Sequence, residues 1–333
     1  VTLSFKRDLY KLFERMKKRI IEVPMNLNEL SGDVYSQLEK LTSKYIFDNR
    51  SLRFGEKVKD IYQEVKDRRD PNGNIGIPSK YPTIMKYFCY EKGELVMVSG
   101  RMKMGKSSFM LNEAMDKIQR GIATVYFDTE MNDRLFYIRM MANLTGIDQN
   151  KIKSGNLTIE EERIIDDTND WIEKQPFVHI FIPNSSNEEI YVICKMLKYS
   201  MNLEFVIYDY FKSGESDSSA QYSDLGAKCD FMKNRVAGEL DVAVLAGAQL
   251  NRNDEVADSD KLERYASVST KWRKKTPEEK ETDGKECGNY AMTIKCNRLG
   301  EGMFDDEYID FKFAGNVMRI DEAEQHTEQE VPY

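Results

Sequence analysis

The spacing of apolar residues divides the chain into a helical first part and an alternating remainder. Between residues 3 and 20, apolar side chains recur at helical spacing among lysines and arginines, which predicts a basic amphipathic helix. Two further helical stripes run from Val34 to Tyr45 and from Phe54 to Val65. The basic face of the first helix fits a solvated packing helix or a contact with a membrane or polyanion, and packing is the commoner case.

A dense group of turn-forming residues at 70–78 (DPNGNIGIP) separates this part from the rest. Beyond it, short apolar runs alternate with helical patterns, which predicts an α/β domain with a mainly parallel central sheet. Predicted strands cover 94–99, 123–128, 178–182, 205–208 and 242–246, predicted helices cover 107–120, 188–200 and 223–239, and antiparallel edge strands are expected at 290–295, 308–313 and 317–320. We therefore expect a small helical N-terminal and linker region at 1–75, an α/β domain at 76–322 and a frayed acidic tail at 323–333.

Composition narrows the class of protein. With 41% apolar residues among 333 and no long uninterrupted apolar run, a membrane-spanning chain and a wholly disordered one are excluded. The net charge of −8 excludes a uniformly basic nucleic-acid coat but leaves room for a local basic strip. Five cysteines without a C-x-x-C pair favour reduced thiols over a disulfide framework or zinc site. The charged first residues lack the apolar core of a secretory signal, so we expect a cytoplasmic protein.

The strongest chemical signal is the run GRMKMGKS, from Gly100 to Ser107, between a predicted strand and a predicted helix. Its glycines allow backbone N–H groups to cradle the phosphates of a nucleoside triphosphate, Lys106 can reach the β and γ phosphates, and the Ser107 hydroxyl can ligate Mg²⁺. The expected nucleotide-binding residues are Gly100, Gly105, Lys106, Ser107, Ser108 and Asp209.

Four polar residues that follow predicted strands are candidates for the remaining chemistry. Asp209 ends the apolar run FVIY, as expected of a Walker B acid that holds Mg²⁺, although an ordinary turn acid fits as well. Glu130 in YFDTEM can orient the attacking water as general base; alone, it is equally a solvated loop acid. Gln249 in AGAQLNR can bond the γ-phosphate, and Arg298 in KCNRLG can be offered to a phosphate, but each signal is weak by itself.

In order and spacing, these motifs resemble the RecA-type ATPase domain of DnaB-like replicative helicases, over residues 76–321. The resemblance implies a RecA-like P-loop NTPase fold and a ring hexamer that binds ATP and Mg²⁺ between subunits, moves along single-stranded DNA and unwinds duplex at the fork. It makes Glu130 the catalytic base, Gln249 the γ-phosphate sensor, and Lys295 with Arg298 the group that a neighbour inserts in trans. The reduced size is similar to phage-encoded members, and a primase or helicase loader is a candidate partner.

Two departures from the family pattern matter. Asn297 stands where the bacterial proteins usually carry the finger arginine, and Arg298 comes one residue later, as in RadA-like relatives. Which residue is the finger therefore stays open. The region before residue 76 is also smaller than the bacterial N-terminal domain, so primase binding is not carried over with the motifs.

Two segments are candidate DNA-contacting loops. Residues 211–224 are polar and rich in glycine and serine, and the second half of 251–275 concentrates basic residues. The candidate phosphate contacts are Lys212, Arg252, Lys261, Arg264, Lys271 and Arg273. A solvated basic loop balanced by the acidic run at 277–281 fits equally well, and Trp272 is more often a packing residue than a base-stacking one.

Two other functions remain open at this point. One is a RadA-like or KaiC-like ATPase of the RecA family that acts in recombination and does not unwind DNA. The other is an ATP-gated scaffold on single-stranded DNA, in which hydrolysis serves only as a release signal.

Overall fold

The structure is a computed structural model that describes residues 2–22, 27–46, 54–67, 75–211, 226–250, 265–304 and 307–326. The chain divides into two compact units, one made of residues 1–69 with 186–193 and the other of residues 70–185 with 194–333. Each unit is described by itself below.

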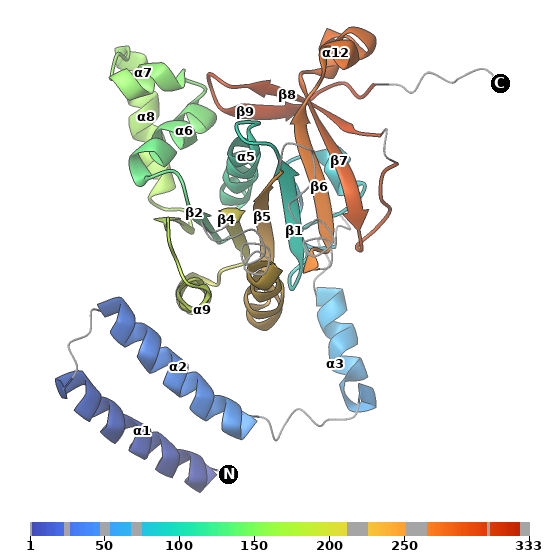
Figure 1. The fold of residues 1–333 in the computed structure, drawn as a ribbon. Helices are drawn as coiled ribbons and strands as arrows, with labels where there is room; N and C mark the ends of the chain where they lie inside the picture. The colour runs from blue at the N-terminus through green and yellow to red at the C-terminus, as the bar shows by residue number, and fades with distance from the viewer. Residues whose placement is uncertain are drawn as a thin grey trace, which may run out of the picture. The chain divides into compact units, whose positions relative to one another are not determined.

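The first unit contains the three predicted helices, α1 (Thr2–Glu22), α2 (Leu27–Ile46) and α3 (Phe54–Asp67), as Figure 1 shows. Leu12 and Met16 of α1 are buried, and α1 packs against α2. The basic side chains that surround this stripe are largely exposed. The apolar stripe of α1 therefore packs in the way that the packing interpretation predicts, and the basic face is exposed.

The second unit is built on a sheet that has nine strands in the described residues, in the order β3-β2-β4-β5-β1-β6-β7-β8-β9 (Figure 1). The strands are β1 (Leu95–Gly100), β2 (Thr124–Asp128), β3 (Phe177–Phe181), β4 (Phe205–Phe211), β5 (Ala243–Gln249), β6 (Val268–Lys274), β7 (Tyr290–Asn297), β8 (Ile309–Ala314) and β9 (Arg319–Glu322). All pairs from β3 to β6 are parallel, and the pairs from β6 to β9 are antiparallel.

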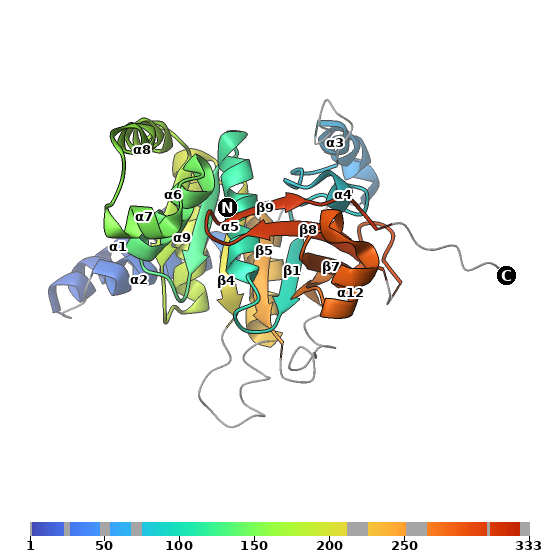
Figure 2. The ribbon, with the colours of Figure 1, turned by 90° about the horizontal axis from the view of Figure 1, so that it is seen from above.

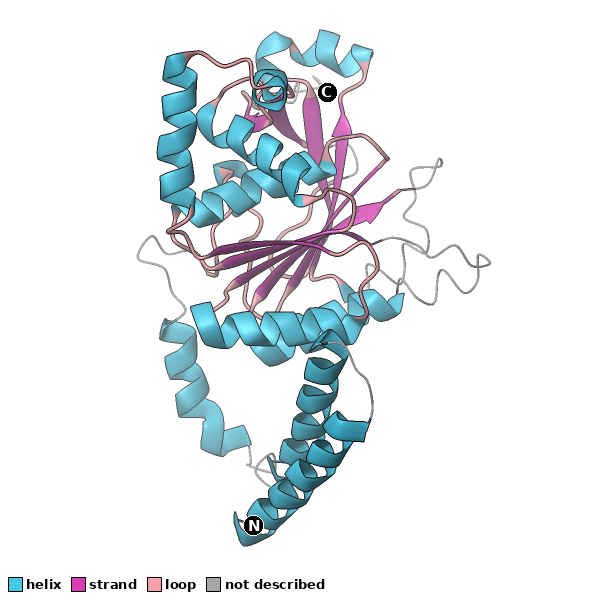
Figure 3. Cartoon of the chain, turned by 90° about the vertical axis from the view of Figure 1, so that its left-hand side faces the viewer, coloured by secondary structure: helices cyan, strands magenta, loops and turns pink. Residues whose placement is uncertain are grey.

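Helices cover both faces of this sheet (Figure 3). The described helices after residue 75 are α4 (Pro82–Met85), α5 (Lys106–Gln119), α6 (Asp133–Thr145), α7 (Gln149–Ser154), α8 (Ile159–Ile172), α9 (Asn187–Met201), the π-helix η2 (Met232–Glu239), α12 (Pro277–Asp283) and the 3₁₀-helix η3 (Lys285–Cys287). Helix α5 runs along β4 and β5 (Figure 2), and η2 contacts β1 and β5. Strand β1 is buried along its whole length, and a strand buried on both faces carries a continuous apolar run. This explains why the run at 94–99 predicted the strand.

The predicted strands and helices of the second unit are present, apart from residues 223–225, which lie outside the described ranges. Two expectations are wrong. Residues 268–274 form the buried strand β6 and not a loop, because Val268, Thr270 and Trp272 alternate into the core. The acidic tail is not frayed at 323–326, where Ala323 N donates to Asp310 O at 3.1 Å.

Candidate nucleotide-binding site

The phosphate-binding loop joins the carboxyl end of β1 to the first turn of α5, as its sequence predicts. Gly105 is the N-cap of α5 and has a φ of 81°, in the left-handed region that favours glycine. A Cβ atom on Gly100 would lie 2.6 Å from the carbonyl oxygen of Trp272, so the loop also requires glycine there. Trp272 is fully buried, and its Nε1 donates to the carbonyl oxygen of Met104 at 2.9 Å. The tryptophan therefore supports the loop from β6 and is a packing residue.

Lys106 is buried at the start of α5. Its Nζ donates to the carbonyl oxygens of Gly100, at 2.7 Å, and Arg101, at 3.1 Å. Burial lowers the pKa of Lys106, and the carboxylates of Asp209 and Glu130 oppose that shift. The ammonium group is thus held at the mouth of the loop by two neutral carbonyl groups, and an anionic phosphate would be the stronger partner because it also carries a charge.

Asp209 lies within β4, opposite Asp128 of β2, and is only 2% exposed. Its carboxylate accepts hydrogen bonds from the hydroxyl groups of Ser107, at 3.1 Å, and Tyr126, at 2.7 Å. Desolvation, followed by the charge of Asp128, raises the pKa of Asp209 from 3.8 to about 7, against the opposing effects of these hydrogen bonds and of Lys106.

These groups fit a bound Mg²⁺ ion. The hydroxyl of Ser107 and the carboxylate of Asp209 are hard oxygen ligands that already lie within hydrogen-bonding distance of each other. Desolvation, followed by the charge of Asp128, makes the ionised form of Asp209 costly, and a divalent cation would stabilise that form. The two predicted metal ligands are therefore brought together by β4 and α5.

Glu130 is exposed two residues after the end of β2, and its position is fixed by two neighbours, Asp128 and Tyr210. The Asp128 Oδ1 atom accepts hydrogen bonds from the backbone N–H groups of Glu130, at 2.8 Å, and Met131, at 2.6 Å. The hydroxyl of Tyr210 donates to Glu130 Oε1 at 2.8 Å. Tyr210 follows Asp209 directly, but no sequence pattern indicates that its hydroxyl reaches across to β2.

The other oxygen of Asp128 faces a histidine. Asp128 Oδ2 lies 3.8 Å from His179 Nε2, and neither buried atom has a hydrogen-bond partner in the described structure. His179 Nδ1 lies 2.9 Å from Asp133 Oδ1, and its ring stacks on Phe136 at 3.9 Å. The histidine is therefore packed between two carboxylates, beside the turn that carries Glu130.

Gln249 is the last residue of β5 and pairs with Gly100 of β1. The sequence predicts it just beyond the strand, so the structure extends β5 to include it. Because β1 and β5 are parallel neighbours, the amide of Gln249 lies at the same sheet edge as the phosphate-binding loop.

Lys295 and Arg298 are not brought to this edge. They lie at the end of β7, where Asn297 pairs with Val268, the first residue of β6. Val268 in turn pairs with Val96, which precedes Gly100 by four residues, or about 13 Å of strand. Arg298 therefore lies toward the amino end of β1, away from Lys106 of the same chain, and Lys295 lies level with the middle of β1.

Asn297 has a structural role in this loop. Its Nδ2 atom donates to the carbonyl oxygens of Tyr87, at 3.0 Å, and Glu301, at 2.7 Å, while its Oδ1 accepts from the N–H of Leu299 at 3.0 Å. The exposed Arg298 follows it, anchored by its own N–H to the carbonyl oxygen of Ser267 at 2.8 Å. The asparagine shapes the loop that carries the arginine.

Most of the candidate DNA contacts, Lys212, Arg252, Lys261 and Arg264, lie outside the described residues. The other two belong to β6 and not to a loop. Lys271 is half-buried and pairs with Ser99 of β1. The guanidinium of Arg273 makes a bidentate ion pair with Glu279 of α12, at 2.6 and 2.7 Å, and lies over the ring of Tyr308. Arg273 therefore stabilises α12 and is not a loop cation.

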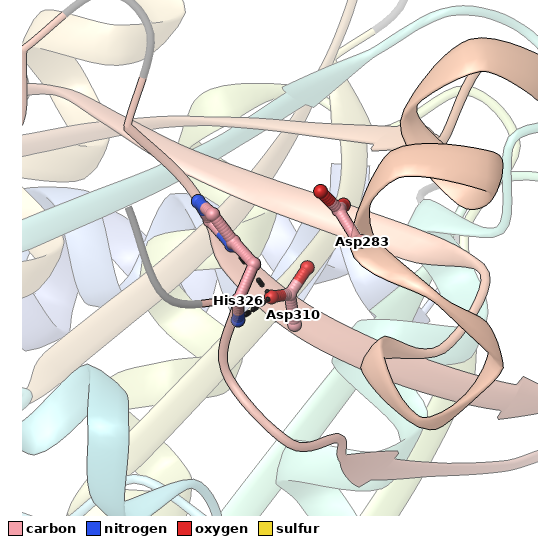
Figure 4. Close-up of side chains that lie close together, drawn as sticks. All are labelled: Asp283, Asp310 and His326. Carbon is pink, nitrogen blue, oxygen red and sulfur yellow. Dashed lines mark hydrogen bonds and ion pairs between the residues drawn. The ribbon is translucent and has the colours of Figure 1, made fainter. Parts of the chain in front are cut away.

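One group of potential metal ligands in the described residues lies elsewhere, where Asp283, Asp310 and His326 approach one another (Figure 4). His326 Nδ1 lies 2.7 Å from Asp310 Oδ2. The buried ammonium of Lys275 forms ion pairs with both aspartates, at 2.7 Å from Asp283, and donates to the carbonyl oxygen of Cys287 at 2.9 Å. The cationic position of this cluster is therefore already taken by the lysine, which ties β6 to α12 and β8.

Within the described ranges, every helix is too short or too polar to cross a lipid bilayer.

The sequence profile of the DnaB-like helicase C terminal domain matches residues 76–311. The chain is 22% identical over 265 residues to the replicative DNA helicase DnaB of Helicobacter pylori, covering 77% of this chain and 53% of that protein. It is 24% identical over 241 residues to the replicative DNA helicase DnaC of Bacillus subtilis, and the match covers 67% of this chain and 51% of that protein. The chain thus spans about half the length of these relatives.

Two solved structures are similar to this fold. One is an ATPase domain that aligns with a TM-score of 0.68 at 18% identity, covering 82% of this chain and 99% of that one. The other is a DnaB-like replicative helicase, described with its interactions with primase. It aligns with a TM-score of 0.70 at 16% identity, and the alignment covers 95% of this chain and 75% of that one. The predicted RecA-like α/β fold is confirmed by these likenesses. Together with the profile match over most of its length, they mean that the chain belongs to the family of DnaB-like helicase C-terminal domains.

Proposed function

We propose that the chain is the motor of an ATP-dependent, ring-forming replicative DNA helicase that moves along single-stranded DNA and unwinds duplex at the fork. The observation that carries this proposal is the separation of the hydrolysis residues between two edges of the sheet. Lys106, Glu130 and Asp209 lie at the carboxyl edge, whereas Arg298 lies toward the opposite end of β1 and Lys295 lies level with its middle. A head-to-tail ring, hexameric as in our prediction, would bring these edges of neighbouring copies together.

In the proposed mechanism, Lys106 and the N–H groups of the loop bind the phosphates of ATP, and Glu130 orients a water molecule and accepts its proton. Ser107 and Asp209 would hold Mg²⁺, which supplies neutralisation of phosphate charge when bound. Gln249 bonds the γ-phosphate from β5. Arg298 of the adjacent subunit, assisted by Lys295, stabilises charge on the transferred phosphoryl group, an effect worth ~10³ to 10⁵ in rate for a finger supplied in trans.

Single-stranded DNA is the proposed polymer partner, and Lys212, Arg252, Lys261, Arg264 and Lys271 are its proposed phosphate contacts. Binding through such contacts depends steeply on salt, because each neutralised phosphate releases counterions. A primase or helicase loader is a further proposed partner, supported by the likeness to a DnaB-like helicase described with primase.

A mixing experiment tests the shared site. Lys106→Ala and Arg298→Ala are each expected to abolish DNA-stimulated ATP hydrolysis when assayed alone. In an equimolar mixture of the two, about one interface in four combines an intact phosphate loop with an intact arginine, if copies assemble at random in a head-to-tail ring. We therefore expect the mixture to recover up to about a quarter of the wild-type rate.

The control is a mixture of Lys106→Ala with the double variant Lys106→Ala, Arg298→Ala, which contains no intact phosphate loop and is expected to stay inactive. A mixture of the two single variants that remains as inactive as this control would refute a site completed in trans. Strand displacement on a forked duplex tests the motor function itself. Robust DNA-stimulated hydrolysis without displacement would favour the non-unwinding ATPase or scaffold.

A further inference from the structure

The side chain of Tyr210 joins three parts of the proposed catalytic site. It follows Asp209 on β4, and its hydroxyl donates to Glu130 Oε1 at 2.8 Å. The Nζ atom of Lys106 lies 5.6 Å from the centre of its ring. The tyrosine therefore stands between the lysine of the phosphate-binding loop and the proposed general base.

The Cβ atom of Tyr210 packs closely against β5. A Cβ atom on Gly247 would lie 2.9 Å from the Cβ of Tyr210, so the absence of a side chain at Gly247 makes room for the tyrosine. Burial, together with the hydrogen bond to Glu130 and its charge, raises the pKa of the Tyr210 hydroxyl. In this contact the hydroxyl is the donor and the carboxylate of Glu130 accepts.

The main chain of Glu130 is fixed independently of this contact. Asp128 Oδ1 accepts its backbone N–H, and Thr129 N donates to the carbonyl oxygen of Asp209 at 3.0 Å. What remains free is the flexible side chain of Glu130, which is exposed and would otherwise sample many rotamers. A hydrogen bond at its tip removes that freedom, because it fixes the carboxylate relative to β4.

We propose that Tyr210 is a positioning residue, which holds the Glu130 carboxylate beside Asp209 and the phosphate-binding loop so that it is aligned for its task. This inference rests on the proposed function, in which Glu130 is the general base. The contact comes from the residue next to the proposed Mg²⁺ ligand, and the charge of Glu130 also acts on Lys106, so the tyrosine ties the carboxylate to the strand that carries Asp209. Misplacement of a catalytic group by about 1 Å can cost ~10²-fold in rate.

The test is Tyr210→Phe in the full chain, assayed as the oligomer with single-stranded DNA. Phenylalanine keeps the ring beside Lys106 and Gly247 and removes only the hydroxyl. We expect kcat for ATP hydrolysis to fall about tenfold, less than the ~10² to 10⁴ expected for Glu130→Gln. Affinity for a non-hydrolysable ATP analogue should remain within about twofold of wild type, because no phosphate contact is lost.

Two comparisons separate positioning from a purely structural role. In a Glu130→Gln background, Tyr210→Phe should cause no further loss, because the tyrosine acts through that carboxylate. Tyr199→Phe removes a hydroxyl from an exposed tyrosine of α9 and should leave kcat unchanged. An unchanged or increased kcat for Tyr210→Phe, or an equal fall in both backgrounds, would overturn the proposal. Full activity of Glu130→Gln alone would instead overturn the assignment of the general base.

Discussion

Replacement of Asp209 by asparagine is expected to stabilise the protein at alkaline pH when Mg²⁺ is absent. Desolvation and the neighbouring Asp128 raise the pKa of Asp209 from 3.8 to about 7 in the folded state. In the unfolded chain this carboxyl ionises near its ordinary pKa. At pH values between the two pKa values, the folded state therefore keeps a proton on Asp209 that the unfolded state has released. Folding stability is therefore lost as the pH rises from about 4 to about 7. At ~1.36 kcal/mol for each pKa unit, the full loss is about 4 kcal/mol.

The assay compares thermal unfolding of the wild type and Asp209→Asn in EDTA at pH 5 and pH 8. Roughly 1 to 2 kcal/mol of the cost is already present at pH 5, so the advantage of the variant should grow by roughly 2 to 3 kcal/mol at pH 8. That corresponds to roughly 5 to 10 °C in the difference between melting temperatures. Mg²⁺ at pH 8 should raise the melting temperature of the wild type more than that of the variant.

The comparison between the two pH values cancels any effect of the substitution that does not depend on ionisation. Asp166→Asn serves as the matched control, because Asp166 is exposed on α8, and its effect should be the same at both pH values. An advantage of Asp209→Asn that is equal at pH 5 and pH 8 would refute the reasoning, since it would mean that Asp209 ionises alike in the folded and unfolded states.

Two other substitutions test the surroundings of the site. Trp272→Phe keeps an aromatic ring in the core but loses the hydrogen bond to the carbonyl oxygen of Met104. It should weaken binding of a fluorescent ATP analogue and lower the free energy of unfolding, measured in urea, by about 1 to 2 kcal/mol. Unchanged binding would mean that the indole does not support the loop. Lys275→Met leaves the buried Asp310 without its ammonium partner, and in the same assay it should lower the free energy of unfolding by about 3 to 5 kcal/mol. A decrease of less than about 1 kcal/mol would show that the ion pair is dispensable.

Much of the fold could be predicted because its central strands are buried on both faces and so carry continuous apolar sequence. The runs that became β1 and β5 are bounded by polar residues, and their type follows from local pattern alone. Strand β6 was not predicted, because its exposed positions carry lysine and arginine and its buried positions include Thr270. The three helices α6, α7 and α8 were not predicted either, although the capping box formed by Thr158 and Glu161 is a local signal for α8.

The sequence predicts some parts of the candidate site and not others, because some depend on consecutive residues and others on contacts between strands. The sequence by itself determined the phosphate-binding loop, because the turn, the lysine and the hydroxyl residue are fixed by consecutive backbone positions. Only the tertiary structure decided that β2 and β4 are neighbours, which sets Asp128 beside Asp209 and Tyr210 against Glu130. It also decided that Arg298 lies toward the other end of β1. Contacts between strands depend on strand order and register, and these are settled by packing of the whole sheet and not by any local pattern.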